Sequence, residues 1–115
     1  MKKEVNFQTE YEVKNADINL TIVIGKGQPG SSRVRLGDDV VGDGEVKDLL
    51  IGNGDNIKNK ILKITTVVDD FQINTNETCV EYLLTGGKES KKYYLEATVD
   101  VDGDRVNYFT EIKFI

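Results

Sequence analysis

The sequence of 115 residues contains no histidine, no tryptophan, one cysteine and one proline. Without histidine the chain lacks the commonest general base, the usual catalytic triads and the main ligand of transition metals. The single cysteine, Cys79, has no partner for an internal disulfide, and we expect its thiol to be inert. We therefore predict that the protein is not an enzyme and uses no cofactor.

Long apolar runs are also missing, because none approaches the roughly 18 residues of a membrane-spanning helix. The first residues, Met1-Lys2-Lys3-Glu4-Val5-Asn6, lack the apolar core of a signal peptide. The sequence as it stands predicts a cytoplasmic protein without membrane insertion; a chain trimmed of a leader would be extracytoplasmic. Fifteen basic against twenty acidic side chains give a net charge of −5, which disfavours binding to nucleic acid.

Hydrophobic residues recur mostly with a period of two, which predicts strands rather than helices. Residues 5–13 and 18–24 both alternate in this way, with the polar segment 14–17 between them. This pattern predicts a hairpin in which Val13 pairs with Ile18, so that both apolar faces lie on the same side.

The middle of the chain is harder to interpret. Residues 25–44 are rich in Gly, Asp and Ser, and we expect mostly loop there, with at most an edge strand. Residues 46–51 fit either a short strand or one turn of helix, so the structure of residues 25–56 stays open. Alternation returns in residues 61–68 and 80–84, which predicts two further strands.

The C-terminal part gives the clearest pattern. Apolar residues alternate with polar ones over 93–101 and again over 106–114, on either side of Asp102-Gly103. A two-residue type I′ turn at Asp102-Gly103 would pair Ala97 with Tyr108 and place every apolar residue opposite another core-side residue. We therefore predict a C-terminal hairpin.

Seven or eight short strands without a long helix predict an all-β antiparallel β-sandwich, formed as one domain over residues 1–115. The immunoglobulin-like arrangement is the expectation from size and strand count. The cysteine pair and the buried tryptophan that mark antibody domains are both absent.

Residues 25–30 spell G-x-G-x-x-G, the pattern of dinucleotide-binding turns. That chemistry needs a following helix whose N-terminus binds phosphate, and residues 31–37 lack helical periodicity. We interpret the glycines as an ordinary turn.

Two acidic groups resemble cation sites. Asp100, Asp102, Asp104 and Glu111 occupy the first, third, fifth and twelfth places of a calcium loop, but Arg105 replaces the required glycine. In the predicted hairpin Glu111 also lies too far away to close the loop, so we expect no metal site and at most weak, millimolar calcium binding. The second group is expected to be a solvated loop; it comprises Asp38, Asp39, Asp43 and Glu45.

The function that remains after these exclusions is recognition. We expect a non-catalytic interaction module that binds a protein partner through loops or an exposed sheet edge. Tyr94, Phe109, Asn107 and Thr98 would share the outer face of the predicted C-terminal hairpin and form its recognition surface. Two alternatives remain: a small-ligand or carbohydrate-binding module that uses the two aromatic rings as a platform, and an acidic inhibitor or immunity-type protein that binds a basic partner.

Overall fold

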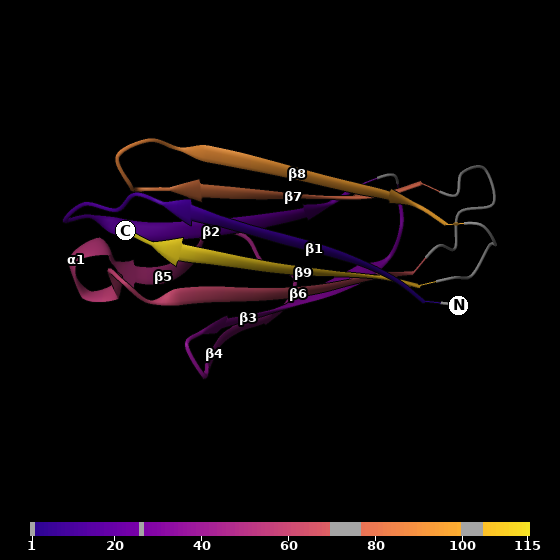
Figure 1. Cartoon of the computed structure of the whole chain (residues 1–115), viewed down its shortest axis with the longest axis horizontal. Coiled ribbons are helices and arrows are strands. Elements are labelled where there is room, and N and C mark those ends of the chain that lie inside the picture. Colours follow the sequence, from indigo (N-terminus) through magenta and orange to yellow (C-terminus); the bar gives the residue numbers. More distant parts are fainter. Residues whose placement is uncertain (1, 26, 70–76, 100–104) are drawn as a thin grey trace.

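The computed structural model describes residues 2–25, 27–69, 77–99 and 105–115, and it folds most of them into two packed β-sheets (Figure 1). The elements in chain order are β1 (Lys2–Tyr11), β2 (Asp17–Ile24), β3 (Gly30–Leu36), β4 (Asp39–Gly44), β5 (Leu49–Asn53), α1 (Gly54–Ile57), β6 (Ile61–Asp69), β7 (Glu77–Thr85), β8 (Lys91–Thr98) and β9 (Arg105–Phe114). The predicted all-β sandwich is confirmed, with nine strands in the described part of the chain.

One sheet has five strands in the order β1-β9-β6-β3-β4, and the other has four in the order β5-β2-β7-β8. All neighbouring strands are antiparallel except β1 and β9, which run parallel from the pair Lys2 and Arg105 to the pair Tyr11 and Phe114. The strands predicted over residues 61–68 and 80–84 are confirmed as β6 and β7.

The core lies between the sheets and is built from the inward-facing residues of alternating strands. In β9 the buried residues are those that the sequence pattern assigned to the core: Val106, Tyr108, Thr110, Ile112 and Phe114. Because successive side chains of a strand point to opposite faces, the same alternation leaves the polar residues of β9 on the outer face.

The predicted N-terminal hairpin is wrong, because β1 and β2 belong to different sheets. β1 pairs with β9, whereas β2 pairs with β5 and β7. Val13, which was expected opposite Ile18, donates its N–H to the carbonyl of Ile115 (2.9 Å). In a sandwich both sheets present an apolar face to one core, so alternation identifies the inward side of each strand but not the sheet to which it belongs.

The predicted C-terminal hairpin is wrong for the same reason. β8 pairs with β7 in the four-stranded sheet, and β9 pairs with β1 and β6 in the other. Ala97 therefore lies opposite Thr78, and Tyr108 lies opposite Val5 and Thr66. The predicted turn at Asp102-Gly103 lies outside the described residues. The immunoglobulin-like arrangement is not confirmed, since that fold keeps its last two strands together in one sheet.

Residues 25–44, expected to be mostly loop, contain the hairpin of β3 and β4. Gly37, at the turn, has a φ of +62°, a backbone conformation that suits glycine. Residues 46–51, which fitted either a strand or a helical turn, contain the first part of the strand β5. The short helix α1 follows β5, and its N-cap Asn53 accepts a hydrogen bond from the Asp55 N–H (2.9 Å). Of the described helices, none is long and apolar enough to cross a membrane.

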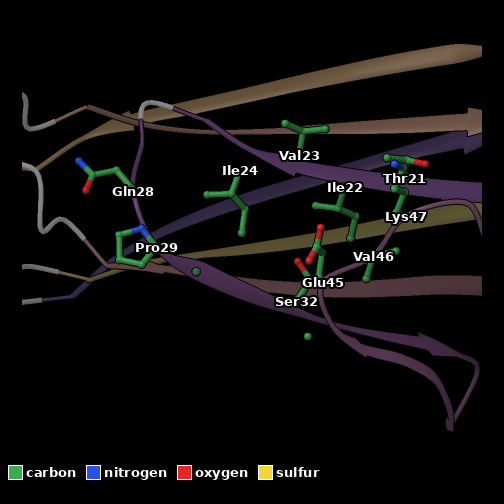
Figure 2. A pocket seen from close by; sticks show the side chains of 12 residues that line it. Thr21, Ile22, Val23, Ile24, Gln28, Pro29, Ser32, Glu45, Val46 and Lys47 are labelled. Carbon is green, nitrogen blue, oxygen red and sulfur yellow. The ribbon is translucent and has the colours of Figure 1, made fainter.

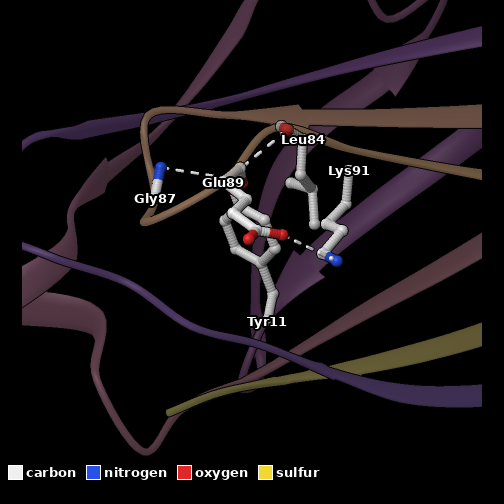
Figure 3. A network of polar contacts seen from close by, with 5 residues as sticks. All are labelled: Tyr11, Leu84, Gly87, Glu89 and Lys91. Atoms are coloured by element: carbon white, nitrogen blue, oxygen red, sulfur yellow. Dashed lines mark hydrogen bonds and ion pairs between the residues drawn. The ribbon is translucent and has the colours of Figure 1, made fainter.

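One lateral side of the sandwich is closed by aromatic side chains. Phe7 of β1 and Tyr93 of β8, on the edges of opposite sheets, bring their ring centroids to 5.6 Å. At the end of β1 the buried Tyr11 hydroxyl donates to the Glu89 carbonyl (2.7 Å) and accepts the Gly87 N–H (3.0 Å), as Figure 3 shows. We call this the closed side; it fixes the turn between β7 and β8 to β1.

Candidate recognition cleft

On the other lateral side the edge of β2 is paired over only part of its length. β5 pairs with residues from Asp17 to Leu20, whereas β7 pairs with the opposite edge as far as Ile24. Beyond Leu20, the Ile22 N–H donates to the Val46 carbonyl (2.9 Å). Backbone groups on one edge of a strand belong to alternate residues, so Ile24 presents its N–H and carbonyl to the same side as Ile22. Among the described residues, no strand pairs with β2 at that position.

The neighbouring edge of β3 is also left open. β4 stops pairing with β3 at Ser32 and Gly44, while Gly30 and Ser31 continue only on the β6 side. Because both sheets lose their edge partner at the same level, a cavity of about 480 Å³ opens between them (Figure 2). We call it the cleft; it is lined by Thr21, Ile22, Val23 and Ile24 of β2, Gln28 and Pro29 of the following connection, Gly30 and Ser32 of β3, and Gly44, Glu45, Val46 and Lys47.

The cleft combines apolar walls with a few polar groups. Ile22 and Ile24 line it from β2, and Val46 lines it from the segment after β4. Ser32 is 3% exposed and forms a hydrogen bond with the Thr66 hydroxyl (2.8 Å). Gln28 is 5% exposed, and its Nε2 donates to the Glu77 carbonyl (3.3 Å). An apolar cavity with a small number of fixed polar groups is the usual composition of a binding site.

The Ser32 hydroxyl is connected through Thr66 to a further hydroxyl group in the core. Tyr82 of β7 is fully buried, and its hydroxyl donates to the Thr66 Oγ1 (3.4 Å), which also contacts Ser32. Burial is the main cause that raises the pKa of Tyr82. The Ser32 hydroxyl is therefore held by a buried network at neutral pH rather than by solvent.

Charged side chains stand at the rim of the cleft. Glu45 and Lys47 are both exposed and both line it. Val23, half-exposed on the outer face beside the open edge, lies opposite Glu81 of β7. In the described part of the chain, neither Glu45 nor Glu81 forms an ion pair.

The predicted recognition surface does not form as one surface. Tyr94 and Thr98 belong to β8 in the four-stranded sheet, whereas Asn107 and Phe109 belong to β9 in the five-stranded sheet. All four belong to the outward-facing sets of their strands, so the two pairs point away from the core in opposite directions. The shared face was inferred from the C-terminal hairpin and is wrong together with it.

Tyr94 nevertheless has a distinct environment. Its side chain is 49% exposed, and its hydroxyl donates to the Glu96 carboxylate (3.3 Å). A hydrogen bond with Cys79, followed by desolvation, raises the pKa of Tyr94 to about 12. Cys79 is buried beside the end of β2, where a Cβ atom on Gly25 would overlap its sulfur. The thiol therefore fills a packing position between β7 and the end of β2.

The glycine-rich and acidic motifs noted in the sequence form no ligand site among the described residues. The G-x-G-x-x-G run joins β2 to β3, so a strand rather than a helix follows it. Asp43 forms an ion pair with Arg33 (3.1 Å). Within the described ranges no group of three or more His, Cys, Asp or Glu side chains could hold a metal ion. Asp100, Asp102 and Asp104 lie outside those ranges, so the calcium expectation stays a prediction.

No protein-family model, no curated protein and no solved structure matches this chain. Function has to be inferred from the cleft itself. Sequence reasoning assigned Ile22 and Ile24 to the core and did not identify the polar lining residues as a site. The available signal was the alternation of Ser32, Val34 and Leu36 with arginines, which marks a strand that needs a neighbour.

Proposed function

We propose that the protein is a non-catalytic recognition module that binds an extended segment of a partner protein in the cleft. The observation that carries this proposal is the coincidence of an unpaired strand edge at Ile24 with a cavity beside it. A segment added to such an edge gains main-chain hydrogen bonds, and the adjacent pocket selects one of its side chains. The added segment would lie in line with β5 and continue the four-stranded sheet.

The composition of the edge supports this proposal. Edge strands are commonly protected from pairing by charged residues. Of the four edge strands in the described part of the chain, three carry such residues: β1 contains Lys3 and Glu4, β4 contains two aspartates, and β8 begins with two lysines, whereas β5 contains none. The part of β2 beyond its pairing with β5, from Thr21 to Ile24, also contains no charged residue. No charged side chain of β2 therefore protects this open stretch against strand addition.

A small-ligand site is the second candidate, because the volume of about 480 Å³ falls within the ~300–1,000 Å³ of typical ligand pockets. The aromatic platform expected for a carbohydrate loses its basis, since Tyr94 and Phe109 lie on opposite sheets. The outer face of the five-stranded sheet pairs Lys63 with Glu111 and Arg33 with Asp43, and this alternation of sign gives no support to an acidic inhibitor.

The test is selection of peptides from a phage-displayed library of random 12-residue sequences, followed by titration of the isotope-labelled protein with synthetic copies. We expect enriched peptides to shift the amide signals of Ile22, Ile24 and Ser32. Ile24→Pro should abolish binding, because it removes an N–H on the open edge without removing a hydrogen bond to β7.

A matched pair of valine variants distinguishes a loss of binding at the cleft from a general effect of a new charge on folding. Val23 and Val40 are 51% and 54% exposed on strands of opposite sheets. Val23→Lys places a positive charge beside the cleft, the kind of residue that protects strand edges, and should weaken peptide binding strongly, whereas Val40→Lys should leave it unchanged. Equal binding by both variants, or amide shifts confined to other strands, would contradict the proposed function.

A further inference from the structure

The apolar and polar side chains that line the cleft indicate which side chain of a partner it accepts. Ile22, Ile24 and Val46 provide an aliphatic wall, and Glu45 and Ser32 provide a carboxylate and a hydroxyl in the same cavity (Figure 2). The Ser32 hydroxyl has two acceptor lone pairs, and its bond with Thr66, in which either hydroxyl can donate, leaves at least one of them available. A side chain that is apolar along its length and a hydrogen-bond donor at its end would match both parts.

The charges around the cleft favour a cation. The ion pairs within the described ranges are Arg33–Asp43, Lys88–Glu12, Lys91–Glu89 and Arg105–Asp69. Glu45 takes part in none of them. Among the described residues Lys47 is the one cation that lines the cleft, and it adjoins Asp48, whose side chain and backbone both bond to the Thr21 hydroxyl. Glu81 lies opposite Val23 on the neighbouring strand, and the net charge of the chain is −5.

We propose that the segment bound in the cleft inserts a lysine or arginine side chain, an inference that rests on the proposed function. The methylene groups of that side chain cover Ile22, Ile24 and Val46, as long basic side chains commonly do on apolar surfaces. The cationic end meets Glu45 and donates to the Ser32 hydroxyl. A purely aliphatic side chain would leave the carboxylate unpaired, and an acidic one would be repelled by it.

The experiment uses acetylated and amidated heptapeptides of the form Thr-Val-Thr-X-Thr-Val-Thr, in which X is lysine, arginine, norleucine or glutamate. Their dissociation constants are measured by amide-shift titration of the wild-type protein, Glu45→Gln and Glu10→Gln. Glu10 is the matched control, because it lies on the outer face of β1 opposite Lys113 and loses the same charge. N-acetyl-lysine amide serves as a probe of the side chain alone.

We expect the lysine and arginine peptides to bind about fivefold more tightly than the norleucine peptide, the effect of a favourable exposed ion pair. Glu45→Gln should remove that difference and Glu10→Gln should keep it. Glu45→Lys should reverse the preference toward the glutamate peptide.

Each contrary outcome has a separate meaning. Equal binding of the norleucine and lysine peptides at the Ile22 and Ile24 amides would overturn the basic-side-chain inference and leave strand binding intact. A lysine preference that Glu45→Gln does not change would also overturn it. Binding of N-acetyl-lysine amide as tight as that of the heptapeptide would overturn strand pairing, because the flanking residues would then contribute nothing. Absence of binding by all four peptides would overturn the inference, and failure of the library selection as well would overturn the proposed function.

Discussion

The closed side and the cleft show two ways in which a β-sandwich can end laterally. On the closed side Phe7 and Tyr93 bridge β1 and β8, and the Lys3 ammonium donates to the Thr98 carbonyl (2.8 Å) between the same two strands. At the cleft no lining residue is aromatic, and β3 contributes only Gly30 and Ser32. The edges of the two sheets are therefore bridged where large rings are present and stay apart where the side chains are small.

This difference has an energetic meaning. Side chains on the closed side lose solvent and gain packing, which stabilises the fold. Ile22 and Ile24 at the cleft also turn apolar surface inward, but the described residues do not fill the space in front of them. Stability should therefore depend strongly on the closed side and weakly on the cleft.

The largest expected effect is at Tyr11. Tyr11→Ala should lower the free energy of unfolding by about 3–5 kcal/mol, because it removes a fully buried ring. Tyr11→Phe keeps the ring and loses the hydrogen bonds of the hydroxyl to Leu84, Glu89 and Gly87, so it should cost about 1–3 kcal/mol. Urea denaturation measures both values. Similar losses in the free energy of unfolding for the two variants would show that packing of the ring does not stabilise the closed side.

Substitutions at two positions on β2 allow a direct comparison between the packed core and the cleft. Leu20 is fully buried beside β5 and β7, whereas Ile24 is only partly buried and lines the cleft. Leu20→Ala should cost about 2–5 kcal/mol and Ile24→Ala about 1 kcal/mol, as thermal and urea unfolding can determine. Equal losses would mean that the cleft is packed as tightly as the core.

The smallest effect is alkaline destabilisation. Burial is the main cause that raises the pKa of Tyr11 and Tyr82 above the ordinary value of 10.0. The folded state then holds these protons more tightly than the unfolded state, so stability is retained below about pH 10 and falls above it, by up to ~1.4 kcal/mol per pH unit for each group. Tyr82→Phe should flatten this decline, and Ile24→Ala should leave it unchanged. A decline that is unaltered in Tyr82→Phe would contradict the assignment.

Local pattern predicted the strands well and their partners badly. The inward-facing residues of β9 follow from alternation alone, because burial on one face imposes a period of two. The pairing of β8 with β7 does not follow, since a turn within a sheet and a connection between sheets leave the same alternation. At most an edge strand was expected where β3 lies, because the run from Ser32 to Leu36 is short, alternates with two arginines and follows a serine-rich start.

The cleft was beyond prediction for a related reason. It exists because β5 and β4 both stop before the strands beside them, and the length of a neighbour is not encoded in the residues of β2. The uncharged stretch from Thr21 to Ile24 was visible, but it is typical of any buried strand. Only the topology shows that one edge of this stretch is unpaired.

The parallel pairing of β1 with β9 also determines how the fold would bear a mechanical load. The start of β1 and the end of β9 lie at opposite ends of the long axis (Figure 1). A pull through Lys2 and Phe114 would act along the two strands and load the whole ladder from Lys2–Arg105 to Tyr11–Phe114 in shear. Its hydrogen bonds would have to break together rather than one after another, so we expect high resistance to stretching along this axis.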